Sequence, residues 1–194
     1  ITDYTTITAG IRADFISAKL NDPSPDFEAL YGGEIKDESE VNIGGNASVK
    51  YQKNGFQTQF AVGRGIRTAS MTERFINHFN VGVDPYEYVG NPNLKWEQSY
   101  QTNLGLDLDL FHKKLNFVVD VYEKKTSDLL LQIVQPSVLG EAGKTLFFNA
   151  GDMTNRGIDL ALGYNSKSKN DFNYGFNVTF AKYKNKITRL NNSD

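Results

Sequence analysis

The sequence predicts an all-β fold, an antiparallel up-and-down transmembrane β-barrel, present as a fragment of about seven strands. Three observations predict it: segments of about ten residues alternate apolar and polar side chains, long and short connections alternate along the chain, and aromatic residues collect near the expected strand ends. A tilted strand needs roughly 9–11 residues to cross a bilayer, about twice the usual length in a globular sheet. The segments are therefore long enough to span a membrane.

The clearest hairpin covers residues 96–125. One face of it takes alternate apolar positions on both sides of a polar break at 112–114, and its members are Tyr100, Thr102, Leu104, Leu106, Leu108, Leu110, Leu115, Phe117, Val119 and Val121. The other face carries acids and amides along the whole span. In a barrel, lipid contacts the first face and water in the lumen contacts the second. A soluble β-sandwich also alternates and stays as the alternative fold.

The same alternation predicts further strands, at residues 6–15, 41–52, 56–65, 156–165 and 172–181. Lys53-Asn54-Gly55 is a strong signal for a tight hairpin turn. The segments 20–40, 66–95 and 126–148 are expected to be long irregular loops, since the first contains Pro23, Pro25 and many acids. Outer-membrane barrels keep short turns on the periplasmic side and long loops outside, so this alternation fits strands that go up and down through one membrane.

Aromatic residues stand near most strand ends, as an interfacial belt would require: Phe15, Tyr51, Phe56, Phe111, Tyr164, Phe172 and Tyr174. An odd number of strands would leave two unpaired edges in lipid. We therefore expect residues 1–194 to be one segment of a larger barrel domain, with any plug domain and the C-terminal strands outside it. No secretory signal opens the sequence, although an outer-membrane protein would need one, so we expect that the signal was removed or that the chain is an excised piece.

Composition excludes several classes of function. The 194 residues carry a net charge of −2 and no Lys/Arg stripe, which removes the electrostatic basis for nucleic-acid binding. The sequence has no cysteine, so a disulfide framework or a zinc–thiolate site is not available. Its two histidines, His78 and His112, offer no recognisable catalytic triad, and His112 is expected to be a solvated turn residue. We expect no enzyme activity and no cofactor.

The loop 66–95 holds the candidate binding residues. Arg67 and Arg74, with Arg64 at the base of the loop and Tyr86 and Tyr88 near its end, could hold an anionic chelate by paired N–H donors and ring faces. The alternative is that these arginines and tyrosines anchor the rim of a barrel at the membrane surface.

Two soft metal ligands lie in the same loop. Met71 and His78 offer a thioether and an imidazole to copper, although ordinary loop packing would explain the pair equally simply. The acid-rich segment 20–40 lacks the ligand order of a known calcium loop and is expected to be a solvated outer surface.

Three segments carry a resemblance to TonB-dependent outer-membrane receptors. FAVGRGIRTASMTERF (60–75) is similar to a strand-to-loop segment of siderophore and copper receptors, and GNPNLKWEQ (90–98) resembles the turn that re-enters the barrel in nearly all family members. KKTSDLL (124–130) and NAGDMTNRGIDLAL (149–162) resemble the nutrient-importing SusC/RagA branch of Bacteroidetes. In the re-entry turn, Pro92 fixes φ and Trp96 is expected to mark the outer membrane interface.

The resemblance implies a 22-stranded barrel in a bacterial outer membrane, filled by a plug domain and opened by the periplasmic energy-coupling protein TonB. The implied partners are membrane lipid, TonB, the plug and an extracellular small-molecule nutrient or chelate, with a surface lipoprotein as a further candidate. The leading expectation is import of a ferric siderophore or another metal chelate. The alternatives are a SusC/RagA-type importer of glycans or peptides and, from another class, a soluble β-sandwich that binds a ligand.

Overall fold

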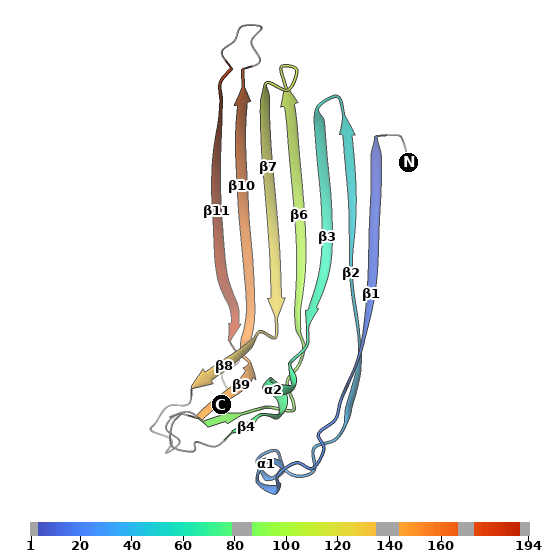
Figure 1. Cartoon of the computed structure of the whole chain (residues 1–194), viewed down its shortest axis with the longest axis vertical. Helices are drawn as coiled ribbons and strands as arrows, with labels where there is room; N and C mark the ends of the chain where they lie inside the picture. Colours follow the sequence, from blue (N-terminus) through green and yellow to red (C-terminus); the bar gives the residue numbers. More distant parts are fainter. Residues whose placement is uncertain (1–3, 79–86, 135–143, 167–172, 191–194) are drawn as a thin grey trace.

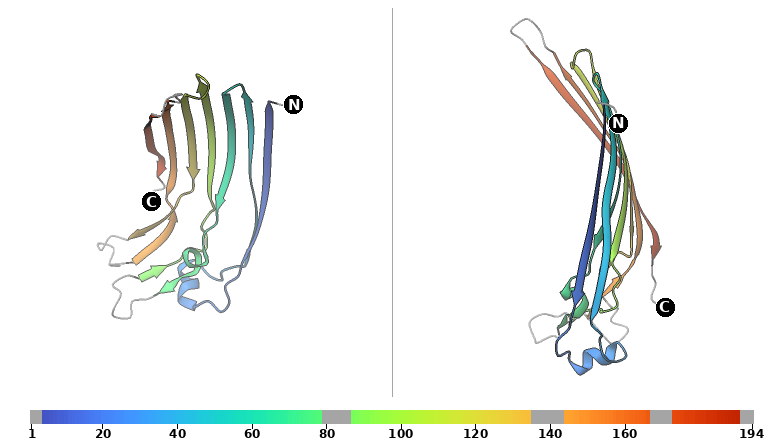
Figure 2. Two further views of the ribbon diagram at one scale, coloured as in Figure 1. Left: turned by 45° about the horizontal axis from the view of Figure 1, so that its top comes forward. Right: turned by 90° about the vertical axis from the view of Figure 1, so that its right-hand side faces the viewer.

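A single curved antiparallel sheet dominates the fold (Figure 1). The computed structural model describes residues 4–78, 87–134, 144–166 and 173–190. Across these residues the main sheet has seven strands, in the order β1 (Thr5–Ala18), β2 (Glu38–Lys53), β3 (Phe56–Arg67), β6 (Glu97–Leu110), β7 (Leu115–Ser127), β10 (Gly151–Asn165) and β11 (Gly175–Leu190). The sheet is open, with β1 and β11 at its edges, and the side view in Figure 2 shows its curvature.

The expected hairpin of residues 96–125 is confirmed. β6 and β7 pair antiparallel from Gln98↔Ser127 to Leu110↔Leu115. The turn between them places Phe111, His112 and Lys113 at positive φ values of 52°, 56° and 65°. The expected turn between β2 and β3 is confirmed too, with Asn54 and Gly55 both in the left-handed region that such two-residue turns require.

The connections separate by length between the two ends of the sheet. The turns β2–β3 and β6–β7 lie at one end, which we call the turn end, together with the described ends of β10 and β11 (Figure 1). The long connections β1–β2, β3–β6 and β7–β10 lie at the opposite end, the loop end. This is the arrangement expected from the alternation of long and short connections.

Pairing in register places like side chains in rows across the sheet. One row is apolar over six strands, and its members are Ile7, Val49, Phe60, Leu104, Val121 and Ile158. The neighbouring row on the other face is polar, with Lys50, Gln59, Gly105, Asp120 and Asp159. The apolar face stays open to its surroundings, since Ile11 and Phe15 are 84% and 77% exposed. A water-soluble sandwich would cover such a face, so this sheet does not follow that alternative.

The apolar face ends at a different row on each strand. Toward the loop end, the unbroken run of apolar residues on this face ends at Phe15 on β1, at Val62 before Arg64 on β3, at Val121 on β7 and at Phe180 on β11. The register can be followed across all seven strands, and it places Phe180 of β11 in the same row as Thr5 of β1. Thr5 lies at the opposite end of β1 from Phe15. The same stagger is visible in Figure 1, where the β6–β7 turn stands above the β2–β3 turn. A level apolar band crossing tilted strands produces this stagger.

The segments expected to be irregular loops contain short elements. They are α1 (Pro25–Leu30), α2 (Met71–Phe75), β4 (Asn77–His78), β5 (Glu87–Val89), β8 (Leu130–Val134) and β9 (Lys144–Asn149). The four short strands form a second sheet in the order β4-β5-β9-β8, in which β5 and β9 run parallel. Local caps begin both helices: the Ser24 hydroxyl accepts from the Phe27 N–H, and Ser70 and Glu73 form a reciprocal capping box. These elements are too short to show a periodicity in the sequence.

Several strand boundaries were also wrong. β2 begins at Glu38, inside the segment expected to contain no strand, while β10 begins at Gly151 and β11 continues to Leu190. Beyond the apolar band both faces are polar, so the alternation stops although the backbone pairing continues. In the described residues, no helix is long and apolar enough to cross a membrane.

Candidate ligand-facing rim

Most buried residues lie at the loop end, in a layer we call the rim, made of α1, α2, the second sheet with Ala150 directly after it, and segment 90–96. Its apolar members with less than a tenth of their surface exposed include Phe27, Val89, Leu94, Trp96, Leu130 and Ala150. The main sheet thus supplies a wall, and the rim supplies the chain's packed interior. Binding residues concentrate on loops that a rigid scaffold holds, so the rim is the candidate site.

Segment 90–96 connects the parts of the rim. The Gly90 N–H donates to the Ile76 carbonyl at 2.6 Å, and the Asn91 N–H donates to the Glu73 carbonyl at 2.9 Å. The Tyr31 hydroxyl donates to the Gly90 carbonyl from the end of α1. A Cβ on Gly90 would lie 2.5 Å from the backbone carbon of Arg74, so only glycine permits this approach.

The side chain of Asn91 continues these contacts. Its Oδ1 accepts from the Asn93 N–H at 2.9 Å, which shapes the turn, and its Nδ2 donates to the Phe147 carbonyl in β9 at 3.2 Å. Burial at the end of α1 raises the pKa of Tyr31, which keeps its hydroxyl available as a donor. The re-entry turn thus fastens α1, α2 and β9 to one another.

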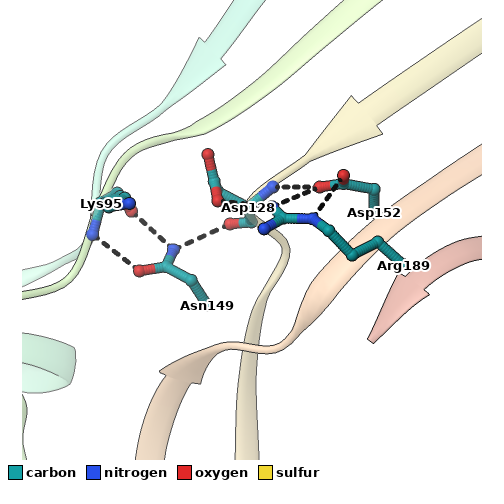
Figure 3. Close-up of polar contacts among 5 residues, drawn as sticks. All are labelled: Lys95, Asp128, Asn149, Asp152 and Arg189. Atoms are coloured by element: carbon teal, nitrogen blue, oxygen red, sulfur yellow. Dashed lines mark hydrogen bonds and ion pairs between the residues drawn. The ribbon is translucent and has the colours of Figure 1, made fainter. Parts of the chain in front are cut away.

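Asn149 performs a similar task between the rim and the main sheet (Figure 3). Its Oδ1 accepts from the Lys95 N–H at 2.7 Å, and its Nδ2 donates to the carbonyls of Lys95 and Asp128, each at 2.9 Å. The neighbouring Asp152 accepts from the Asp128 N–H at 3.1 Å. The segment just before β8 is therefore held both to the segment that leads into β6 and to the start of β10.

Arg189, near the end of β11, completes this network from the edge strand. Its guanidinium donates to Asp152 at 2.8 and 3.1 Å and to Asp128 at 3.2 Å (Figure 3). Hydrogen bonds from one guanidinium to two carboxylates are charge-assisted, so they are strong and also fix the orientation of the three groups. The loop end of β11 is thus tied to the loop between β7 and β8.

Arg67 lies where β3 leaves the sheet. Its guanidinium is 2.5 Å from Glu73 Oε1 and 3.8 Å from Glu97 Oε2, and its side chain remains 49% exposed. Glu73 also accepts from the Ser70 N–H at 2.7 Å. Partial burial acts to raise the pKa of Glu73, but the Ser70 hydrogen bonds and the Arg67 charge outweigh it, and the pKa is lowered.

The other arginines expected to bind ligand have different surroundings. Arg74 is only 4% exposed and its guanidinium donates to the Leu94 carbonyl at 3.4 Å. Arg64 lies on the apolar face of the main sheet, where it donates to Gln98 at 2.8 Å and sits 5.7 Å from the Tyr100 ring. The structure therefore does not bring the three guanidinium groups together on one open surface.

The remaining candidates are spread over the rim. Tyr88 lies in β5, half-buried and opposite His78 of β4, whereas Tyr86 lies outside the described residues. Met71 is the exposed first residue of α2. In the part of the chain that the structure describes, no three His, Asp or Glu side chains gather in a way that could hold a metal ion.

Trp96 does not mark the membrane interface, contrary to expectation. It is 6% exposed and belongs to the rim's interior, because its neighbour Lys95 is bonded to Asn149 of β9 before β6 enters the main sheet. Aromatic contacts do occur at the turn end: Tyr51 and Phe56 meet edge to face at 6.1 Å between ring centroids, and Tyr164 stacks on Phe176 at 5.6 Å.

Two pockets in the rim contain residues that the sequence did not single out. One, of about 280 Å³, is lined by polar and charged residues that include Glu34, Lys36 and Asn93. The other, of about 220 Å³, is mostly apolar, with Leu30, Leu146 and Phe147. Tyr31 lines both. No sequence signal predicts them, because their walls come from segments far apart in the chain.

The polar face of the main sheet also forms a hollow, of about 340 Å³, lined in part by Gln57, Asp107, Asp120 and Asp159. Gln57 donates to Asp107 at 2.7 Å. Polar groups on this face bond one another and remain open to solvent, as expected for the inner wall of a barrel.

The fold and the rim together define a class: a staggered antiparallel sheet with one apolar face, one polar face and its large loops at one end, which is the wall of a membrane β-barrel. The whole chain, residues 1–194, matches the family described as TonB dependent receptor-like, beta-barrel. The chain belongs to this family.

Comparison with individual proteins agrees with this assignment. The chain is 35% identical over 104 residues to the TonB-dependent receptor P3 of Formosa agariphila, and 29% identical over 104 residues to the TonB-dependent receptor SusC of Bacteroides thetaiotaomicron. Each match covers 54% of this chain and 10% of the relative, so the chain spans about a tenth of these proteins. The solved structure of the copper transporter OprC superposes with a TM-score of 0.66 at 16% identity, covering 97% of this chain and 27% of OprC.

Proposed function

We propose that this chain is a wall-and-rim segment of an outer-membrane receptor that imports a scarce nutrient with energy from TonB. The observation that carries the proposal is the separation of the two ends of the sheet. Every long connection lies at the loop end and builds the packed rim, while the described turns at the other end are tight. In this arrangement the loop end faces the outside and the apolar face contacts lipid.

The polar face is the inner wall of the barrel in this proposal. Its amides and carboxylates would face the plug domain of the full-length receptor and the water around it. The rim then stands at the mouth of the barrel, where an extracellular nutrient arrives. The periplasmic protein TonB would act on the plug, so its contacts lie outside these residues.

Arg67 is the residue we assign to direct nutrient contact. It stays half exposed although Glu73 and Glu97 hold its guanidinium from two sides, so its unused donors are fixed in direction. We assign Arg74, with its buried guanidinium, to positioning of segment 90–96. Tyr88, in β5 of the second sheet, stays in the proposal as a ring surface. Tyr86, which lies outside the described residues, stays as a second ring, and Met71 and His78 stay as a copper pair.

Two substrate classes remain in the proposal. The sequence relationship with SusC supports a glycan or peptide importer. A metal chelate, such as a ferric siderophore, would be held through the Arg67 donors, and the fold likeness to OprC does not decide between the classes, because at 16% identity it concerns the fold alone. Of the two, the sequence relationship favours the SusC-type importer.

Uptake by the full-length receptor in its native host tests the proposal. A deletion strain should lose growth on particular glycans or peptides as carbon source, or on a chelated metal as the metal source, and the receptor gene should restore it. Arg67→Ala should then weaken uptake at low nutrient concentration by about ten-fold, since a charge-assisted hydrogen bond contributes on the order of 1.5–3 kcal/mol. Lys113→Ala, at the turn end, is the matched control and should transport normally.

Normal uptake by Arg67→Ala, at an unchanged amount in the membrane, would remove Arg67 from the binding site. No growth defect on any nutrient after deletion would contradict the import function itself.

A further inference from the structure

The apolar face of the main sheet carries a cluster of cations beside the edge of the apolar band that is nearer the loop end. On β11, the positions that follow Phe176, Val178 and Phe180 on the same face are three lysines. The neighbouring strands β10 and β7 add one cation each on this face. We call this set the basic band: Lys125, Arg156, Lys182, Lys184 and Lys186. One carboxylate, Glu123, lies among them. The band therefore carries an excess of positive charge on a face that is otherwise apolar.

The register places this charge directly against apolar residues. Lys182 is paired with Ile158, which is paired with Val121, and Lys184 is paired with Arg156, which is paired with Glu123. The row of Lys182 is thus apolar on the strands before β11, and the next row toward the loop end is charged on β7, β10 and β11. Because the strands are staggered, β11 reaches the edge of the apolar band first.

The ion pairs within the band leave most of its charge unused. Glu123 pairs with Arg156 and, at 3.1 Å, with Lys125. Within the described residues, no acidic side chain pairs with Lys182, Lys184 or Lys186, all of which lie on a strand that is exposed throughout. Three flexible ammonium groups are therefore available to a ligand that approaches from outside the sheet.

A shallow groove joins the basic band to the apolar band. It has a volume of about 600 Å³. Phe60, Leu104, Val121 and Ile158 supply its apolar part, and its charged edge holds three cations and one acid: Arg156, Lys182, Lys184 and Glu123. A hydrocarbon chain matches the first part and an anionic group matches the second. Both chemistries occur in one molecule in a membrane lipid that bears phosphate.

We propose that this groove binds one phosphorylated lipid of the leaflet at the loop end, with an acyl chain on the apolar part and a phosphate between Arg156, Lys182 and Lys184. The inference rests on the proposed function for its orientation, which places the loop end at the outer leaflet. The occupant is a lipid headgroup rather than free phosphate, because the apolar half of the groove would then stay uncovered. A site of this kind holds the barrel at a fixed height in the leaflet and keeps β10 and β11 together near the rim.

Lipid binding to the delipidated full-length receptor tests the site. The receptor in detergent is titrated with monophosphorylated lipid A and with the same lipid after removal of its phosphate, and native mass spectrometry gives the bound fraction. The phosphorylated lipid should bind about ten-fold more tightly than the dephosphorylated one. The double variant Lys182→Gln/Lys184→Gln should lose this preference, since each cation near an anionic surface contributes a few-fold in affinity.

The matched control is Lys113→Gln/Lys114→Gln, which removes the same charge from the β6–β7 turn and should keep the preference. Equal binding of both lipids by the unmodified receptor, or an equal loss in both double variants, would overturn the site. Displacement of the lipid by millimolar inorganic phosphate would show that the cations bind free phosphate, and it would contradict the proposal that a lipid occupies the groove. The measurement involves no import, so a receptor that transports nothing but keeps the preference would contradict only the proposed function.

Discussion

At the scale of single residues, the rim depends on contacts that leave no room for another side chain. Gly90 lies against the backbone of Arg74, and its N–H and carbonyl are both used, by Ile76 and Tyr31. Asn91 and Asn149 are small amides that each bond several backbone groups. The identity of these residues follows from the space around them and from the hydrogen bonds they make within the rim.

Gly90→Ala should therefore loosen the rim without disturbing the wall. The added Cβ would lie 2.5 Å from the Arg74 backbone, so segment 90–96 and α2 must move apart. We expect faster hydrogen exchange at the amides of Asn91 and Ile76. Gly63→Ala is the control, because its nearest neighbour, the Gly45 carbonyl oxygen, would be 3.7 Å away. Equal exchange in the two variants would show that the rim tolerates the change.

The capping box of α2 should respond to pH. The pKa of Glu73 is lowered in the folded chain, so the stabilisation that its carboxylate provides is complete above the ordinary value of about 4.5 and is lost as the pH falls through the folded pKa below it. Amide exchange at Ser70 and Glu73, corrected for the intrinsic effect of pH, should rise as the pH falls below about 4.5. In Glu73→Gln the same amides should exchange independently of pH over this range, and a parallel rise there would assign the effect to another group.

At the scale of elements, each long strand has one apolar and one polar face, and pairing in register aligns each face with the same face of the neighbouring strands. Leu106 pairs with Thr58 and Val119 on the apolar face, while Asn103 pairs with Ala61 and Tyr122 on the polar face. The two positions are close along β6 yet belong to different environments. Substitution with the same residue can therefore separate them.

Leu106→Arg should impair membrane assembly, because a cation facing lipid near mid-span costs about 2–4 kcal/mol. Asn103→Arg should assemble normally, since its side chain joins other polar groups such as Gln101, which donates to Asn103 at 3.1 Å. The heat-resistant folded fraction on a gel after refolding into lipid vesicles measures both. Similar folded fractions for the two variants would contradict the assignment of the faces.

At the scale of the whole molecule, the architecture has a direction: an apolar band in the middle, tight turns at one end and a packed rim at the other (Figures 1 and 2). The second sheet pairs β5 with β9, and these strands come from different connections of the main sheet. The rim is thus a shared structure of several loops. It should stay assembled as one unit on the outside of the membrane.

Labelling of single cysteines on intact cells tests this direction. Glu34→Cys is placed at an exposed position of the β1–β2 connection, and Lys113→Cys in the β6–β7 turn. A membrane-impermeant maleimide should label Glu34→Cys on intact cells and Lys113→Cys only after the outer membrane is opened. The reverse pattern would invert the topology and move the basic band to the periplasmic leaflet.

The sequence was sufficient for the wall. The alternation from Leu104 to Leu110 predicts a face, and Asn54-Gly55 predicts a turn, because side-chain direction in a strand and φ in a two-residue turn are local properties. The alternation also located the long connections. It stopped at residue 181, because the face that carries Phe176, Val178 and Phe180 continues with Lys182, Lys184 and Lys186 and no longer contrasts apolar with polar residues.

The rim was decided by tertiary structure alone. Arg67 and Arg74 look equivalent in the sequence, yet one is half exposed between two carboxylates and the other is buried against segment 90–96. The parallel pairing of β5 with β9, the pockets around Tyr31 and the burial of Trp96 each join segments that are distant in the chain. Such contacts depend on which loops the wall brings to the same end, and periodicity within any one segment carries no record of its neighbours.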